Sequence, residues 1–167
     1  MRKFVVGTSE DPVTSDIFFT LQLRTVNEPL FPKLETFECE RVTGAFIPFV
    51  PSLPSCKTTE IDIGFDEDLS TVMAGSMITK LPTLCPDLEH ITLIRLPRDL
   101  VITAAVSNLL LTCNRNVVQW FCVDSPSTEE AHEVVFQLPN LSHLWVVIQG
   151  HTLLPPVALP SLITIVI

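Results

Sequence analysis

The residue types that could do chemistry in this chain are its cysteines, histidines and clustered acidic side chains. Cysteine occurs five times, an odd number, and no two cysteines stand at C-x-x-C spacing, so the sequence supports neither a disulfide framework nor a zinc site. We predict reduced, buried thiols that serve as small apolar residues. They are Cys39, Cys56, Cys85, Cys113 and Cys122.

The densest acidic cluster comprises Asp62, Asp66, Glu67 and Asp68. Its spacing misses the calcium-binding EF-hand loop and the glycine that this loop requires. We interpret the cluster as a solvated turn that leads into a helix, where acidic residues favour the helix N-terminus.

The sequence lacks the common catalytic patterns. The chain contains no G-x-G-x-x-G, P-loop or G-x-S-x-G pattern. A nucleophilic Cys113 or Cys122 lacks an identifiable histidine–acid arrangement, and His90 with His143 would need a third metal ligand. We therefore expect a protein that is not an enzyme and that holds no cofactor or metal; a hydrolase on an α/β fold is the weakest alternative.

The composition of the chain excludes several classes of function and partner. The chain has 167 residues, 47% of them apolar and 17% charged, with a net charge of −9. Such an acidic balance argues against a nucleic-acid or anionic-membrane partner. The longest apolar segment, 100–113, is shorter than the roughly 20 residues that span a bilayer. The apolar run at residues 4–6 is too short to form the hydrophobic region of a signal peptide. We expect an intracellular protein of one domain.

A repeat organises the chain. Its form is an apolar residue, Pro, any residue, Leu, then alternating apolar positions. The four clearest copies are 31–39, 85–93, 138–146 and 159–167, and two copies without the aligned Pro lie at 59–63 and 118–123. The last apolar residues of the copies are Cys39, Ile63, Leu93, Val123, Val146 and Ile167, at intervals of 24, 30, 30, 23 and 21 residues. These intervals are close to the spacing of leucine-rich repeats, which is about 20–29 residues.

Helical signals lie between the expected strands. Apolar spacing predicts one helix over 67–80 and a second from the N-cap Asp99 to Cys113, and a capping box at 127–130 opens a third. Proline before a strand would end the preceding helix. We predict an α/β leucine-rich-repeat solenoid of about six irregular repeats, with parallel strands on the concave face and helices and Pro-rich loops on the convex face. Residues 1–14 are expected to be loosely ordered, and 15–167 to form a partial array that lacks a C-terminal cap and self-associates through its last strand.

Segments 31–37, 81–91 and 138–141 resemble the repeat arrays of fungal F-box-like proteins, and the resemblance covers roughly residues 15–167. It implies the substrate-recognition repeats of a ubiquitin-ligase receptor. Nothing in residues 1–30 matches an F-box, so the adaptor of a cullin–RING ligase is expected as a partner only if an F-box lies outside this chain. The alternative is a structural or scaffold repeat protein without a link to ubiquitin.

The strand alignment also predicts which side chains face away from the core. One outward row is Thr36, Glu60, His90, Trp120, His143 and Thr164, and the next is Glu38, Asp62, Thr92, Cys122, Trp145 and Val166. A register slip of one residue would turn these rows inward. Because tryptophan is enriched in binding hot spots, we predict an aromatic anchor beside an acidic shoulder that favours a protein partner with a basic segment. The predicted partner-binding residues are Glu38, Glu60, Asp62, His90, Trp120, His143 and Trp145.

Overall fold

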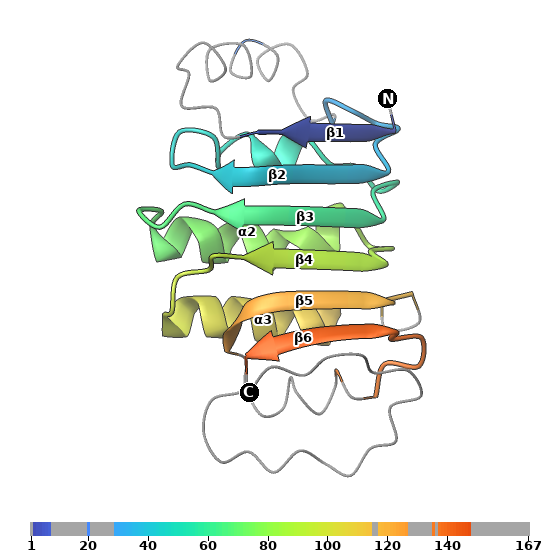
Figure 1. Cartoon of the computed structure of the whole chain (residues 1–167). Coiled ribbons are helices and arrows are strands. Elements are labelled where there is room, and N and C mark those ends of the chain that lie inside the picture. Colours follow the sequence, from blue (N-terminus) through green and yellow to red (C-terminus); the bar gives the residue numbers. More distant parts are fainter. Residues whose placement is uncertain are drawn as a thin grey trace.

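A computed structural model gives the fold and describes residues 2–7, 20, 29–114, 117–126, 135 and 137–147. Within these residues six strands form one α/β sheet, all parallel and ordered as they occur in the chain (Figure 1). The strands are β1 (Lys3–Val6), β2 (Thr36–Val42), β3 (Glu60–Phe65), β4 (His90–Ile94), β5 (Trp120–Pro126) and β6 (His143–Val147).

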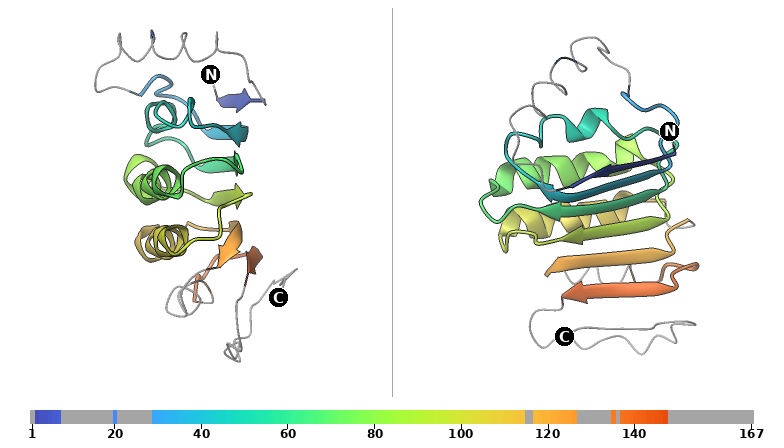
Figure 2. Two further views of the ribbon diagram at one scale, coloured as in Figure 1. Left: turned by 90° about the vertical axis from the view of Figure 1, so that its left-hand side faces the viewer. Right: turned by 45° about the horizontal axis from the view of Figure 1, so that its top comes forward.

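The helices lie on one face of the sheet. They are the short 3-10 helix η1 (Val50–Ser52) and the α-helices α2 (Thr71–Leu84) and α3 (Leu100–Thr112), which pack against each other. In the left view of Figure 2, the helices all lie to the left of the strands, and no described helix covers the opposite face. We call this opposite side the open face.

The helix predicted over 67–80 lies further along the chain than expected. It begins at Thr71 and runs through Pro82 to Leu84, so Pro82 does not end it. Proline in the last turn removes only one hydrogen-bond donor, and the helix ends instead where the Cys85 N–H donates to the Leu81 carbonyl. The expected N-cap of the second helix is confirmed, since the Asp99 carboxylate accepts a 2.8 Å hydrogen bond from the Val101 N–H.

The predicted register is confirmed in β2 to β6. Thr36, Glu60, His90, Trp120 and His143 are cross-strand neighbours, and so are Glu38, Asp62, Thr92, Cys122 and Trp145. Alternate residues point into the core between sheet and helices. These core residues, all at most 2% exposed, are Phe37, Cys39, Ile61, Ile63, Ile91, Leu93, Phe121, Val123 and Leu144.

One backbone device links each described strand to the next. The carbonyl of the residue before each of the strands β1 to β5 accepts from two consecutive N–H groups of the next unit: Arg2 from Glu35 and Thr36, Glu35 from Thr59 and Glu60, Thr59 from Glu89 and His90, Glu89 from Gln119 and Trp120, Gln119 from Ser142 and His143. One residue earlier, a buried side chain recurs at Leu34, Thr58, Leu88, Val118 and Leu141. The sequence repeat is therefore a structural one.

Some expectations fall on other parts of the chain. Strand β1 lies within the segment expected to be loosely ordered and was not anticipated from the sequence. Most of the third expected helix, and all of the last copy at 159–167 with its uncapped strand, lie outside the described residues. None of the described helices has the length and apolar character needed to cross a membrane.

Candidate functional site: a hollow on the open face

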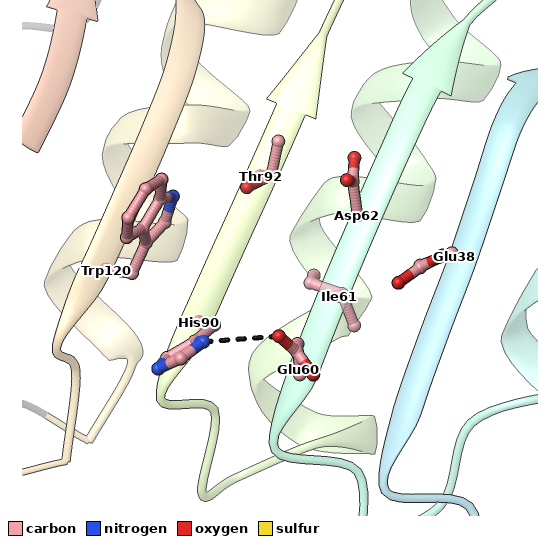
Figure 3. Close-up of a pocket in the computed structure, with 7 residues that line it drawn as sticks. All are labelled: Glu38, Glu60, Ile61, Asp62, His90, Thr92 and Trp120. Carbon is pink, nitrogen blue, oxygen red and sulfur yellow. Dashed lines mark hydrogen bonds and ion pairs between the residues drawn. The ribbon is translucent and has the colours of Figure 1, made fainter. Parts of the chain in front are cut away.

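A hollow of about 290 Å³ lies on the open face across β2 to β5 (Figure 3). Outward side chains from both predicted rows form its lining, together with the buried Ile61 of the strand beneath. The lining residues are Glu38, Glu60, Ile61, Asp62, His90, Thr92 and Trp120. Five of the seven predicted partner-binding residues thus meet around one depression, and His143 and Trp145 lie next to it on β6.

The carboxylate of Glu60 contacts two neighbouring side chains, one through each oxygen. Thr36 Oγ1 donates to Glu60 Oε2 at 2.8 Å, and the Nδ1 atom of His90 lies 3.3 Å from Glu60 Oε1. Three adjacent strands contribute to this chain of contacts, which fixes the His90 ring at the edge of the hollow (Figure 3). Glu60 therefore positions His90, while its side chain stays 45% exposed and keeps lone pairs free for a ligand.

Lys3 is a member of the site that the sequence did not reveal. Its Nζ lies 2.5 Å from Glu38 Oε1, across the β1–β2 pair. This contact raises the pKa of Lys3 above its ordinary value, with Glu38 the main cause. The acidic shoulder therefore contains one neutralising cation, because β1 extends the sheet past the first predicted strand.

Asp62 lies at the centre of the hollow and has no such partner. Its carboxylate makes no hydrogen bond or ion pair with any residue that the structure describes. Partial burial raises the pKa of Asp62, and the nearby carboxylates of Glu38 and Glu60 raise it further. Asp62 is thus an acceptor whose negative charge is poorly compensated by the described part of the chain.

An aromatic stack forms the opposite wall. The rings of Trp120 and His143 are 4.2 Å apart between centroids and inclined by 26°, which is a stacked pair, and His90 lies 6.5 Å from Trp120 on the other side. The side chain of Trp120 is 37% exposed and that of Trp145 is 43% exposed. Both tryptophans face outward, as predicted. Large aromatic side chains this accessible are candidates for contact with a partner.

Arg95 lies at the end of the open face where the strands end, and the sequence did not predict its role there. Arg95 adopts a left-handed backbone conformation with φ of 58°, and its guanidinium donates to the Glu40 carbonyl. The guanidinium crosses Gly64, where a Cβ would overlap both groups. Asp124 accepts from the backbone N–H groups of Arg95 and Leu96. Arg95 therefore supplies a second cation at the border of the open face.

The acidic turn was only partly predicted. Asp66 is 8% exposed and accepts at 2.7 Å from Arg41 Nε, so it is buried and paired rather than solvated. Hydrogen bonds from Arg41 and from the Asp68 N–H lower the pKa of Asp66. Glu67 and Asp68 are exposed, as expected. In the described ranges no three His, Cys, Asp or Glu side chains are grouped so that they could hold a metal ion.

The five thiols are free, and Cys39, Cys85 and Cys113 are buried as predicted. Burial raises the pKa of Cys39 to about 11 and that of Cys85 to about 12, so these thiols stay protonated at neutral pH. Cys56 departs from the prediction and is exposed, because it lies in the turn after η1 instead of in a strand. Cys122 is half-buried in the second outward row.

No protein family, no curated protein and no solved structure matches this chain.

Proposed function

We propose that the chain is a leucine-rich-repeat solenoid whose open face is a protein-binding surface, with no catalytic role. The parallel strands would then be the concave side and the helices the convex side of the array. The chain-ordered sheet, the helices on one face and the carbonyl device shared by successive units support this proposal.

One observation carries the binding role. The exposed Trp120–His143 stack adjoins the acidic residues Glu38, Glu60 and Asp62 on a face that no described helix covers. An exposed aromatic group beside a charge of one sign combines an anchor with a means of selecting partners. The same side chains offer no nucleophile activated by a base, which favours binding over catalysis.

The resemblance to F-box-like proteins would make this surface the substrate-holding part of a ubiquitin-ligase receptor. No residue of this chain is assigned to the adaptor. Purification of the complete gene product with a tagged cullin–RING adaptor tests this half of the proposal. If the adaptor is not recovered, the chain is better described as a scaffold repeat protein. The binding surface has a separate test, which does not depend on the adaptor.

That test uses a photo-crosslinking amino acid placed at position 92 on the open face and, as a control, at Ser76 on the exposed side of α2. Partners should be crosslinked from position 92 and not from position 76. Trp120→Ala should remove them while the far-ultraviolet circular dichroism stays unchanged. Equal crosslinking from both positions, or crosslinking that survives Trp120→Ala, would contradict the proposal.

A further inference from the structure

The hollow has a definite pattern of polar groups that the described chain leaves unused. Besides the Asp62 carboxylate, the Thr92 hydroxyl and the indole N–H of Trp120 make no hydrogen bond with a described residue. Figure 3 shows the three side chains on neighbouring strands β3, β4 and β5, with the indole nitrogen on the side of the ring toward β4. The site thus offers one anionic acceptor, one hydroxyl and one donor.

The negative charge of the hollow favours a cationic ligand. Glu38 is paired with Lys3, and Glu60 contacts Thr36 and His90, whereas Asp62 has no partner among the described residues. Lys3 and Arg95 point to other partners, at opposite ends of the face. A positive group that reaches Asp62 would also lie within the field of the two neighbouring carboxylates.

The flat aromatic wall favours an arginine side chain of a ligand over a lysine side chain. A guanidinium is planar, stacks on aromatic faces and pairs with a carboxylate through two parallel N–H groups, whereas an ammonium is a compact and strongly hydrated point charge. Trp120 already has His143 stacked on it, which holds the indole plane in place. A fixed plane beside a free carboxylate fits a planar cation.

We propose that this hollow binds the side chain of an arginine in an extended segment of the partner. The guanidinium pairs with Asp62 and lies against Trp120, while a backbone carbonyl of the segment accepts from the Trp120 indole N–H. This inference rests on the proposed function and names the chemistry that its surface recognises.

The test uses three acetylated and amidated pentapeptides with glycine at every position except the third, which is arginine, lysine or citrulline. Citrulline has the shape of arginine without its charge. Binding is followed by NMR through the Trp120 indole N–H and the backbone amides of β3 and β4. We expect the arginine peptide to shift these signals, the lysine peptide to bind more weakly, and the citrulline peptide to bind about tenfold more weakly or not at all.

Two variants with the same change in net charge separate this site from general electrostatics. Asp62→Asn should weaken arginine-peptide binding about tenfold, whereas Asp68→Asn, which alters an exposed carboxylate in the turn before α2, should leave it within about twofold. Equal losses in both variants, or equal binding of the arginine and citrulline peptides, would overturn the inference.

The outcomes also distinguish this inference from the function on which it rests. If all three peptides shift the backbone amides of β3 and β4 equally and Trp120→Ala abolishes these amide shifts, the open face binds peptides but does not recognise a guanidinium. If none of the peptides affects any signal of the open face and the crosslinks from position 92 are absent, both proposals fail.

Discussion

Thr58 provides a sharp test of how successive units are held together. Leucine or valine precedes β2, β4, β5 and β6 at the equivalent position, so the repeat pattern alone suggests that an apolar residue at 58 would stabilise the fold. The structure indicates the opposite. The side chain of Thr58 is fully buried, its hydroxyl donates to the Leu34 carbonyl at 2.9 Å, and it accepts from the Ser55 N–H at 3.1 Å.

The size of the effect follows from these two hydrogen bonds. Thr58→Val keeps the shape of the side chain but leaves a buried carbonyl and a buried N–H without the hydroxyl. Each unsatisfied buried group costs about 1–3 kcal/mol. Local relaxation of the turn at 55–58 offsets part of this, so we expect a loss of about 2–3 kcal/mol in the free energy of unfolding. Thr58→Ser keeps the hydroxyl and loses one methyl group, which costs about 1 kcal/mol.

Urea denaturation followed by circular dichroism measures both variants. If the free energy of unfolding falls by about 2 kcal/mol per M urea, Thr58→Val should lower the urea midpoint by about 1 M. Thr58→Ser should lower it by about half as much. The slope should stay constant, which shows that the variants change stability and not the unfolded ensemble. A Thr58→Val midpoint equal to that of the unmodified chain, or above that of Thr58→Ser, would refute this reasoning.

Three further predictions concern glycine packing, helix capping and pH. Gly64→Ala should lower the free energy of unfolding by about 1–3 kcal/mol, because a Cβ there overlaps a neighbouring backbone carbonyl. A Cβ at Gly44 has nothing within 4 Å, so Gly44→Ala should be close to neutral. The urea midpoints of the two variants check this difference. Asp99→Ala should lower the thermal midpoint by removing an N-cap bond worth about 1 kcal/mol, while Ser70→Ala, at an N-cap without a side-chain bond, should have little effect. Partial desolvation and the carboxylates of Glu38 and Glu60 raise the pKa of Asp62 in the folded chain, so its ionisation opposes folding. Because this side chain is exposed, solvent screens the repulsion, and Asp62→Asn should raise the free energy of unfolding by only about 0.2–0.5 kcal/mol at neutral pH. That gain should fade as the pH falls below the ordinary aspartate range, and a gain independent of pH would contradict the assignment.

The sequence was sufficient to predict the register of the open face. Alternation along each strand and the aligned leucine before it leave one arrangement in which Phe37, Ile61, Ile91 and Phe121 are all buried. A slip of one residue in any strand would expose that strand's apolar set, so the outward rows follow from the core. The positions of Trp120 and Trp145 were therefore predictable without any knowledge of the partner.

The features that the sequence did not predict depend on contacts between distant residues. Strand β1 has four residues and lacks the Pro-x-Leu signature, so only its pairing with β2 identifies it. The ion pairs of Lys3 with Glu38 and of Arg41 with Asp66 follow from that sheet, not from local spacing. Helix α2 begins later than predicted because Asp66 pairs with Arg41 and its carbonyl accepts from the Leu69 N–H, which closes a turn ahead of the helix.

The connections between strands differ in length, yet the rows on the open face stay in step from β2 to β6. Neighbouring side chains within a row are therefore about 4.8 Å apart, which is the distance between neighbouring strands. An extended chain crossing the strands presents side chains on one side about every 6.7 Å. Two such steps, about 13.4 Å, fall within about 1 Å of three strand spacings, about 14.4 Å, so the two spacings agree again only three strands further on. A segment that crosses the strands would thus line up with them at two residues four positions apart, and the residues between these two could vary freely.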